Sequence, residues 1–300
     1  MNFLARALLF SRAHEFGGSY LFERVGQRSR AHFTLPSFDV NWFTGREAEI
    51  FDHLILPKGG SGRHLFVDSR DEPTALPVAG SVSLKTSVSQ RTAAEQVICI
   101  PYIDTVDDHS YLFRERGREF EYGSSFVGSA TRRRISILAH IEAQACFPYF
   151  FKTRNGCFLD RHLRADVKSY TRAEVIERQR SRERFLHAAT RSRYMLALPG
   201  FGANTSRFFE SLSMGVAPIL VAGDTALPFS QDIPYAEFSF RVSDDPACPA
   251  RTATTVIGLI EDHWDEAMAR GRLGRLYYDA YLSRGNLLYR LHSLLSSTLA

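Results

Sequence analysis

The sequence has very little lysine. Of its 37 basic residues only four are lysines (Lys58, Lys85, Lys152 and Lys168), and the other 33 are arginines. Planar guanidinium groups suit the recognition of phosphate and carboxylate, although a codon bias of the source genome would give the same count. The 33 acidic residues are interleaved with the basic ones, and the net charge is only +4. No basic tail or block stands alone, so a nucleic-acid-binding role is at most weakly indicated.

Other features are scarce or missing. The four cysteines are scattered without a CxxC pair or any zinc-like spacing, which argues against a structural metal site and against a disulfide framework. No apolar run approaches the roughly 18 residues of a membrane span. The opening segment Met1–Phe10 is short and carries Arg6 in its middle, so it does not resemble a signal peptide. We therefore expect a cytoplasmic protein, with peripheral attachment to a membrane as the alternative.

The composition and length indicate two folded domains. With 300 residues, 44% of them hydrophobic and 12% aromatic, the chain can build two sizeable cores. Short β-branched or aromatic runs alternate with longer helical patterns, which predicts an α/β fold with mostly parallel sheets. The charged segment Arg114–Glu121 is a plausible crossover. We accordingly predict one domain over residues 1–122 and a second, Rossmann-like domain over residues 123–300 that ends in helices.

The predicted elements follow this pattern along the chain. In the first domain we expect a helix over Thr44–Leu54 and strands over His64–Asp68 and Val97–Pro101. In the second, strands are expected at Ser125–Gly128, Tyr149–Lys152, Tyr194–Leu198 and Ala217–Ala222, and helices at Arg132–Phe147, Arg172–Ala189, Ser206–Met214, Ala253–Arg270 and Leu273–Leu295. The order βαβαβαβ is that of a nucleotide-binding domain.

The segment Tyr194–Asp224 carries most of the chemical information. An apolar strand ends at Pro199, a loop with Gly200 and Gly202 follows, and a helix begins near Thr205 or Ser206 and is ended by Gly215. Such a loop lets backbone N–H groups and the positive end of the helix converge on an anion. In that helix, Arg207 would add a bidentate donor, and Glu210 could accept hydrogen bonds from vicinal hydroxyls. A diphosphate joined to a ribose presents both needs, whereas two glycines alone are also compatible with a simple tight turn.

This segment resembles the signature of the exostosin-type glycosyltransferases. The similarity rests on a Pro-Gly loop at Pro199–Gly202, an Arg-aromatic-aromatic-acid-Ser-Leu helix at Arg207–Leu212, a Gly-x-x-Pro strand at Gly215–Leu220, and Leu227–Phe229 after Asp224. Weaker matches follow in the same order upstream, at Ala31–Trp42, Gly62–Leu65, Val97–Tyr102, Phe126–Gly128 and Arg132–Arg134. The family usually has Ala-Asp where this chain has Ala31-His32, and often has Asp where Glu95-Gln96 stands.

The resemblance implies a GT-B-like architecture, with two Rossmann-like α/β domains facing across a cleft. It also implies a hexosyl- or pentosyl-transferase that works with inversion and without a metal or other cofactor, on a nucleotide-sugar, UDP-linked by preference, and a saccharide acceptor, as in polysaccharide biosynthesis. The chain has no Asp-x-Asp motif. The predicted donor-binding residues are Gly128, Arg132, Arg133, Arg134, Gly200, Gly202, Ala203, Asn204, Thr205 and Glu210, with Arg207 stabilising the departing diphosphate.

Inversion in a single displacement also needs a general base in the first domain. Asp104, after the Val97 strand, is the first candidate, and Asp68, His14 and Glu15 are alternatives. His64, Trp42 and Phe201 are candidate contacts that are equally compatible with a structural role.

Two other functions remain open at this stage. One is a fucosyltransferase-like GT-B enzyme that takes a GDP-sugar, although the lysine usual before its acidic helix is missing. The other is a non-catalytic, arginine-rich nucleic-acid-binding or scaffold protein. A eukaryotic member of the exostosin type with an N-terminal anchor would lie in the Golgi lumen, and the oligomeric state is open.

Overall fold

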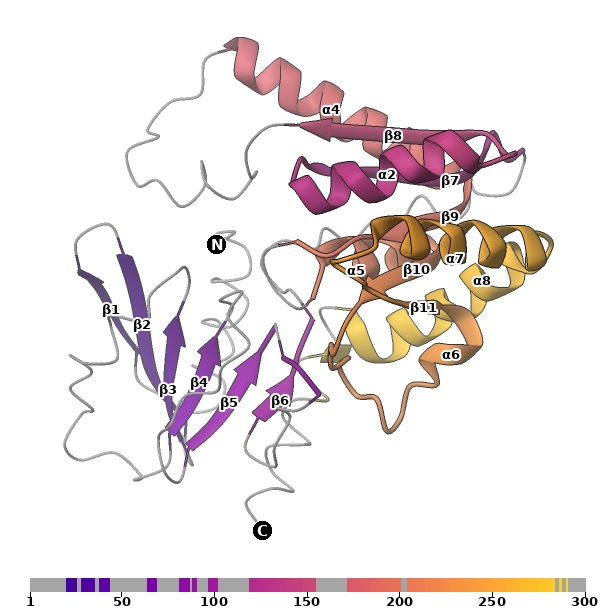
Figure 1. Cartoon of the computed structure of the whole chain (residues 1–300). Coiled ribbons are helices and arrows are strands. Elements are labelled where there is room, and N and C mark those ends of the chain that lie inside the picture. The colour runs from indigo at the N-terminus through magenta and orange to yellow at the C-terminus, as the bar shows by residue number, and fades with distance from the viewer. Residues whose placement is uncertain are drawn as a thin grey trace.

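A computed structural model of the chain shows two β-sheets with helices (Figure 1). The structure describes residues 20–25, 28–35, 38–43, 64–68, 81–86, 88–90, 97–101, 119–154, 172–200, 204–283, 286, 287 and 290. The predicted helix over Thr44–Leu54 lies outside these residues. So do the candidate bases His14, Glu15 and Asp104, and the loop residues Phe201, Gly202 and Ala203.

The first sheet has six strands in sequential order. They are β1 (Tyr20–Val25), β2 (Arg28–Leu35), β3 (Phe38–Phe43), β4 (His64–Asp68), β5 (Ser81–Lys85) and β6 (Val97–Cys99). Strands β3 to β6 pair in parallel, whereas β1–β2 and β2–β3 pair antiparallel. The predicted strand over His64–Asp68 is confirmed. The stretch Ala31–Trp42, one of the weaker matches to the exostosin type, contributes to two antiparallel strands, since Ala31 of β2 pairs with Trp42 of β3.

The second sheet is wholly parallel and has the order β11-β10-β9-β7-β8. Its strands are β7 (Tyr122–Ser129), β8 (Tyr149–Arg154), β9 (Ser192–Ala197), β10 (Ala217–Ala222) and β11 (Phe240–Ser243). The helices are α2 (Arg132–Gln144), α4 (Arg172–Thr190), α5 (Ser206–Met214), α6 (Tyr235–Phe238), α7 (Pro249–Asp262) and α8 (Ala267–Tyr277), followed by the π-helical turn η3 (Tyr278–Leu282). The predicted α/β class and the Rossmann-like second half are confirmed, and β7 begins at the predicted end of the first domain.

The central strands of this sheet are buried on both faces, which explains the continuous apolar run of β10. On one face, Ile219 and Val221 of β10 join the core under α2 and α7. On the other face, Leu220 and Ala222 pack with Phe208 and its neighbours under α5 and α8, and α4 covers β7 and β9. The alternation of side chains along β10 thus places helices on both faces, the doubly wound arrangement.

The C-terminal helices differ from their predicted bounds. The expected helix over Ala253–Arg270 is interrupted by a turn at residues 263–266, and the expected Leu273–Leu295 helix starts earlier as α8 and widens into the π-helical η3. Trp264 accounts for the interruption, because its ring stacks under the guanidinium of Arg193, 4.3 Å away, and against Phe147. A continuous helix would carry Trp264 away from these partners. No helix in the described part of the chain is long and apolar enough to cross a membrane.

The two sheets touch where β5 ends. Ala226 N–H donates to the Val88 carbonyl (2.8 Å) and Gln90 N–H to the Asp224 carbonyl (3.0 Å), which makes a one-residue β-bridge between Ser89 and Thr225. The thiol of Cys99 donates to the carbonyl of Ala226 at 3.4 Å. We call residues 86–90 with residues 223–226 the sheet junction.

Candidate functional site

The second sheet has a topological switch point between β7 and β9. These strands pair only as far as Ser125 and Met195, whereas β7 continues alongside β8 to the pair Ser129–Arg154. Helix α2 follows β7 on one face, and α5 follows β9 on the other. Open α/β sheets bind their ligands at the carboxyl ends of strands that part at such a switch point. We call the gap between the carboxyl ends of β7 and β9 the crevice.

Helix α5 begins beside this crevice, as the sequence predicts. Thr205 occupies the N-cap position, but its side chain makes no capping hydrogen bond among the described residues. The buried side chain of Asn204 is held twice: its Oδ1 accepts from Thr205 N–H at 2.8 Å, and its Nδ2 donates to the carbonyl of Thr86 at 3.3 Å. Gly215, with φ 70° and ψ 27°, ends the helix in the left-handed conformation that glycine adopts readily.

Arg207 and Glu210 form an ion pair in the first two turns of α5. The Glu210 side chain is 7% exposed and that of Arg207 18% exposed. Arg207 Nε also donates to the carbonyl of Val127 at 2.7 Å, and its guanidinium lies over the ring of Phe185, 4.5 Å from the centroid. Arg207 and Glu210, the residues predicted to contact a phosphate and a ribose, therefore lie side by side and are held in place. Their charges cancel, so any net positive potential at the crevice comes from other groups.

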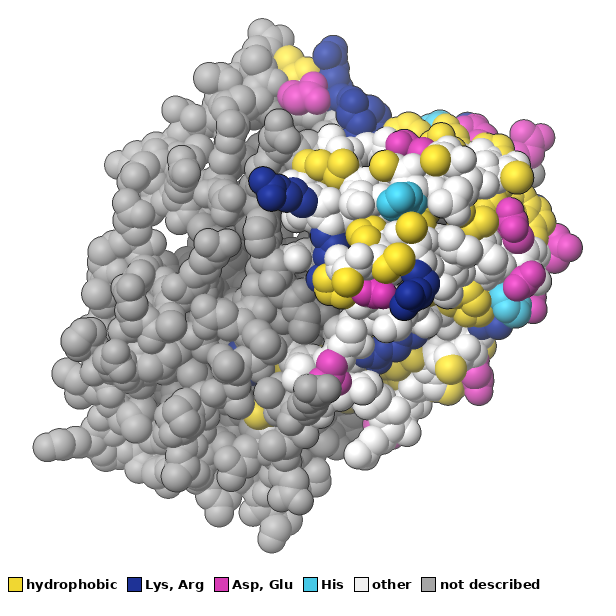
Figure 2. All heavy atoms as spheres, viewed as in Figure 1, with side chains coloured by type: hydrophobic (Ala, Val, Ile, Leu, Met, Phe, Trp, Pro, Cys, Tyr) yellow, Lys and Arg dark blue, Asp and Glu magenta, His cyan; other side chains and the backbone are white. Residues whose placement is uncertain are grey.

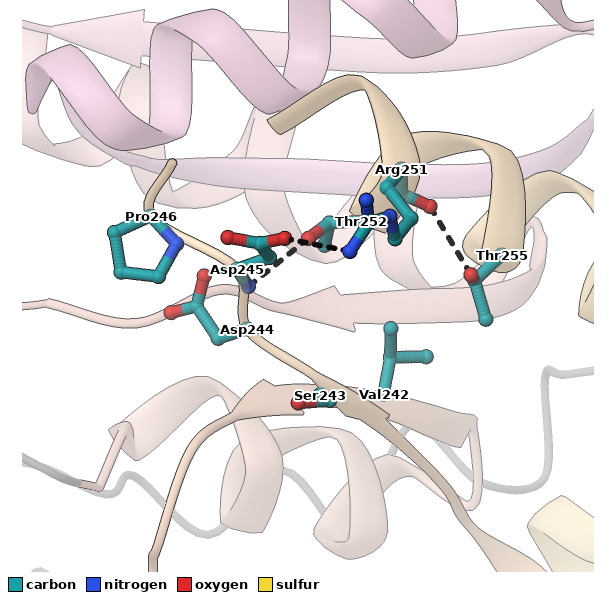
Figure 3. A pocket seen from close by; sticks show the side chains of 8 residues that line it. All are labelled: Val242, Ser243, Asp244, Asp245, Pro246, Arg251, Thr252 and Thr255. Atoms are coloured by element: carbon teal, nitrogen blue, oxygen red, sulfur yellow. Dashed lines mark hydrogen bonds and ion pairs between the residues drawn. The ribbon is translucent and has the colours of Figure 1, made fainter. Parts of the chain in front are cut away.

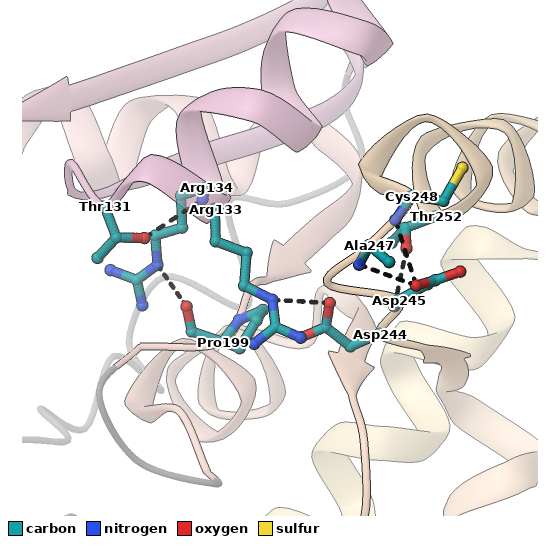
Figure 4. A network of polar contacts seen from close by, with 9 residues as sticks. All are labelled: Thr131, Arg133, Arg134, Pro199, Asp244, Asp245, Ala247, Cys248 and Thr252. Carbon is teal, nitrogen blue, oxygen red and sulfur yellow. Dashed lines mark hydrogen bonds and ion pairs between the residues drawn. The ribbon is translucent and has the colours of Figure 1, made fainter.

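The three consecutive arginines of α2 have different surroundings, and Figure 4 shows those of Arg133 and Arg134. Arg134 is buried, and its guanidinium donates to backbone carbonyls at the crevice, including that of Pro199 at 3.0 Å. Arg133 makes an ion pair with Asp244 through two nitrogens, with Nε 2.9 Å from Oδ1. Arg132, the first residue of α2, is exposed. Of the three, Arg132 is the one whose charge faces solvent.

The predicted glycines have packing roles that the structure makes explicit. A Cβ at Gly128 would lie 2.7 Å from the Phe126 ring, and one at Gly200 would lie 3.1 Å from Arg134 Nη2. Gly200 therefore allows a close approach between the loop and a buried guanidinium. Asp68 and His64 are the last and first residues of β4 in the first sheet, and Trp42 lies in β3.

Sequence reasoning missed Asp244 and Asp245, which follow β11 at the carboxyl edge of the second sheet. Asp245 Oδ1 accepts from the N–H groups of Ala247 (3.0 Å) and Cys248 (3.2 Å), and so closes the turn into α7 (Figure 4). Two carboxylates directly after a short apolar strand were the available signal. Their contacts with Arg133 and with the turn are structural.

A pocket of about 380 Å³ opens beside this turn (Figure 3). Its lining comes from the end of β11, the turn and the start of α7: Val242, Ser243, Asp244, Asp245, Pro246, Arg251, Thr252 and Thr255. Arg251 Nη1 lies 3.1 Å from Asp245 Oδ2 across it. The described residues contain no cluster of three or more His, Cys, Asp or Glu side chains arranged to hold a metal ion.

The surface of the described part carries dispersed charge. In the face shown in Figure 2, Lys and Arg side chains lie at several separate places among neutral and acidic ones. Arg191 pairs with Glu121, and Arg184 with Glu177, so part of this positive charge is neutralised locally. In the described part of this face the arginines do not form one continuous patch of the kind that tracks a nucleic-acid backbone.

Comparison with known proteins gives likeness of fold only. No family model matches the sequence, and no match is found among curated proteins. Among solved structures the chain is similar to TarM (7% identity, TM-score 0.42), to Acinetobacter baumannii MurG (14%, 0.37), and to the pneumococcal O-GlcNAc transferase GtfA in complex with UDP and GlcNAc (10%, 0.38). The matches cover 79%, 72% and 94% of this chain but 50%, 62% and 70% of those chains. All three matches have low sequence identity, and none of them indicates the exostosin type in particular.

Proposed function

We propose that the protein is a glycosyltransferase that moves a sugar from a nucleotide-sugar, a UDP-sugar by preference, to a saccharide acceptor with inversion and without a metal ion. The observation that carries this proposal is the Arg207–Glu210 pair at the start of α5, beside the parted ends of β7 and β9. A nucleoside diphosphate needs an anion-binding helix terminus and a carboxylate for its ribose hydroxyls within one small region. Helix α5 offers both.

Each group then has a role set by its surroundings. Main-chain N–H groups at the start of α5 and the exposed Arg132 bind the diphosphate, whose negative charge grows as it leaves. Glu210 accepts hydrogen bonds from the ribose, and Arg207 holds that carboxylate in place. Asp104 stays the proposed general base on the acceptor side.

Nucleotide binding tests the proposal directly. Calorimetry with UDP should give saturable binding to the wild-type protein, and Glu210→Gln should weaken it by roughly tenfold or more, because the amide leaves Arg207 unpaired and accepts hydroxyl donors less well. Glu261→Gln is the matched control, since Glu261 is an exposed helical carboxylate on α7. Its affinity for UDP should equal that of the wild type.

The same titrations discriminate the other functions. Unchanged UDP affinity in Glu210→Gln, with the fold intact, would refute the assignment of this carboxylate. Tighter binding of GDP than of UDP would replace the preferred donor by a GDP-sugar. Binding of an oligonucleotide that falls steeply with salt and is not displaced by UDP would instead favour a nucleic-acid-binding protein.

A further inference from the structure

The crevice between β7 and β9 is bridged by two arginine side chains. Beyond Ser125 and Met195 the two strands no longer pair with each other. Arg207 donates to the carbonyl of Val127, on the β7 side. Arg134 donates to carbonyls on both sides of the gap, and guanidinium groups therefore supply hydrogen bonds that a continuous ladder would otherwise supply.

At least four of the five N–H donors of Arg134 are engaged in this way. Its Nε donates to Pro199 O (3.0 Å), Nη2 to Leu198 O (3.1 Å), and Nη1 to Ser129 O (3.2 Å) and Ser129 Oγ (2.5 Å). The residue is 7% exposed, and its guanidinium lies 5.4 Å from the centroid of the Phe126 ring. A planar fork with fixed N–H directions can reach two strands at once, whereas a lysine ammonium cannot.

The loop after β9 is shaped to this guanidinium. The position of a Cβ at Gly200 is 3.1 Å from Arg134 Nη2, which is tighter than ordinary van der Waals contact. A side chain at residue 200 would therefore displace either the loop or the arginine. The preceding residue, Pro199, is held by the hydrogen bond that its carbonyl accepts from Arg134 Nε.

We infer that Arg134 is a positioning residue of the donor site and not a ligand of the diphosphate. It fixes Leu198–Gly200 relative to β7 and so sets where the loop leads into α5. This inference rests on the proposed function, and it differs from the sequence-based expectation, in which Arg134 binds the donor. A buried guanidinium with four of its five N–H groups already donating to backbone carbonyls and to the Ser129 hydroxyl has little left for a phosphate.

Three variants test it. Arg134→Lys and Arg134→Ala should both weaken UDP binding by roughly tenfold or more, since a displaced loop loses the anion-binding geometry. Arg275→Lys is the matched control, because Arg275 is also a buried arginine that donates to a backbone carbonyl, that of Ser213, but at the far end of α5. Its UDP affinity should stay within about twofold of the wild type.

Chemical rescue separates positioning from general loss of stability. Added guanidinium chloride at low, non-denaturing concentration should restore UDP affinity to Arg134→Ala, because the free ion can occupy the vacated fork site, whereas methylammonium chloride at the same ionic strength should not. Rescue by both salts, or by neither, would overturn the fork-specific role.

A double-mutant cycle with Gly200 tests the contact itself. Gly200→Ala should weaken UDP binding by roughly tenfold in the wild-type background and by less than about threefold in the Arg134→Ala background. In the second background the Arg134 Nη2 atom that the new Cβ would contact is absent. Equal effects in the two backgrounds would refute the coupling.

Hydrogen exchange without nucleotide keeps this inference distinct from the proposed function. In Arg134→Lys the amide protons of Leu198 and Gly200 should exchange faster than in the wild type or in Arg275→Lys. Unchanged exchange would refute the positioning role even if UDP binds. Faster exchange in a protein that does not bind UDP would instead refute the proposed function and leave the positioning role standing.

Discussion

Asn204 joins the start of α5 to the end of β5 and provides the sharpest test of how the two sheets cooperate. Its Nδ2 donates to Thr86 O at 3.3 Å, and its Oδ1 accepts from Thr205 N–H at 2.8 Å, with the side chain buried. Asn204→Asp keeps the acceptor but replaces the donor by a second oxygen that faces a carbonyl. Asn204→Ala removes both hydrogen bonds.

The expected magnitudes follow from burial. Each hydrogen bond lost at a buried site costs about 1 to 3 kcal/mol when its partner is left unsatisfied, so the loss of both bonds in Asn204→Ala should lower the free energy of unfolding by roughly 2 to 6 kcal/mol. Asn204→Asp loses one bond and gains oxygen–oxygen repulsion beside the proposed diphosphate site. We expect a similar loss of stability and, in addition, weaker binding of UDP than in Asn204→Ala, because the new negative charge opposes the anion.

Urea unfolding, hydrogen exchange and calorimetry measure these effects separately. The amide proton of Thr205 should exchange faster in Asn204→Ala than in Asn204→Asp, since Asp keeps its acceptor. Asn286→Asp is the control: Asn286 is exposed, and its Nδ2 also donates to a backbone carbonyl, that of Asp279 at 2.6 Å. That change should cost less than about 1 kcal/mol. If Asn204→Asp bound UDP as tightly as the wild type, the reasoning that places the diphosphate close to Asn204 would be refuted.

Two further predictions concern packing and a buried thiol. Gly123→Ala should lower the free energy of unfolding by about 1 to 3 kcal/mol in thermal or urea melts, because a Cβ there would lie 2.6 Å from the Phe147 ring and 2.8 Å from that of Trp264; an unchanged midpoint would show that the two rings yield freely. Burial raises the pKa of the Cys99 thiol to about 12 from 9.0, so iodoacetamide should alkylate Cys99 far more slowly than the exposed Cys146 at pH near 9, as read by mass spectrometry. Because the folded state holds this proton more tightly, its contribution to stability is complete below pH 9 and is lost as the pH rises toward 12; comparable labelling rates at the two cysteines would contradict this.

The second sheet shows how far local sequence pattern reaches. Helix α5 over Ser206–Met214 and strand β10 over Ala217–Ala222 have the predicted bounds, because a glycine in the left-handed region separates a helical apolar period from a continuous apolar run. The predicted placement of Arg207 and Glu210 on adjacent turns of α5 follows from helical spacing. Their mutual ion pair does not, since either side chain could equally have faced solvent.

The first sheet shows where local pattern fails. Strands β1, β2, β3 and β5 were not predicted as such, although the residues of β3 and β5 alternate between polar and apolar, because short alternating segments are a weak signal until their pairing partners are known. Whether a segment is a strand there depends on which neighbour pairs with it. The antiparallel return of Ala31 onto Trp42 is of this kind.

The sequence by itself determined the α/β class, the elements around Tyr194–Asp224, and the residues that an anion and a ribose would require, because helical period, glycine conformation and strand hydrophobicity are local properties. The tertiary structure decided what each of these residues does. It parted β7 from β9, placed the guanidinium of Arg134 across the gap, paired Arg133 with Asp244, left Arg132 exposed, and tied Asn204 to Thr86. Three consecutive arginines look alike along the chain, and only the directions in which a helix projects them, onto a strand end, onto a carboxylate and into solvent, make them different.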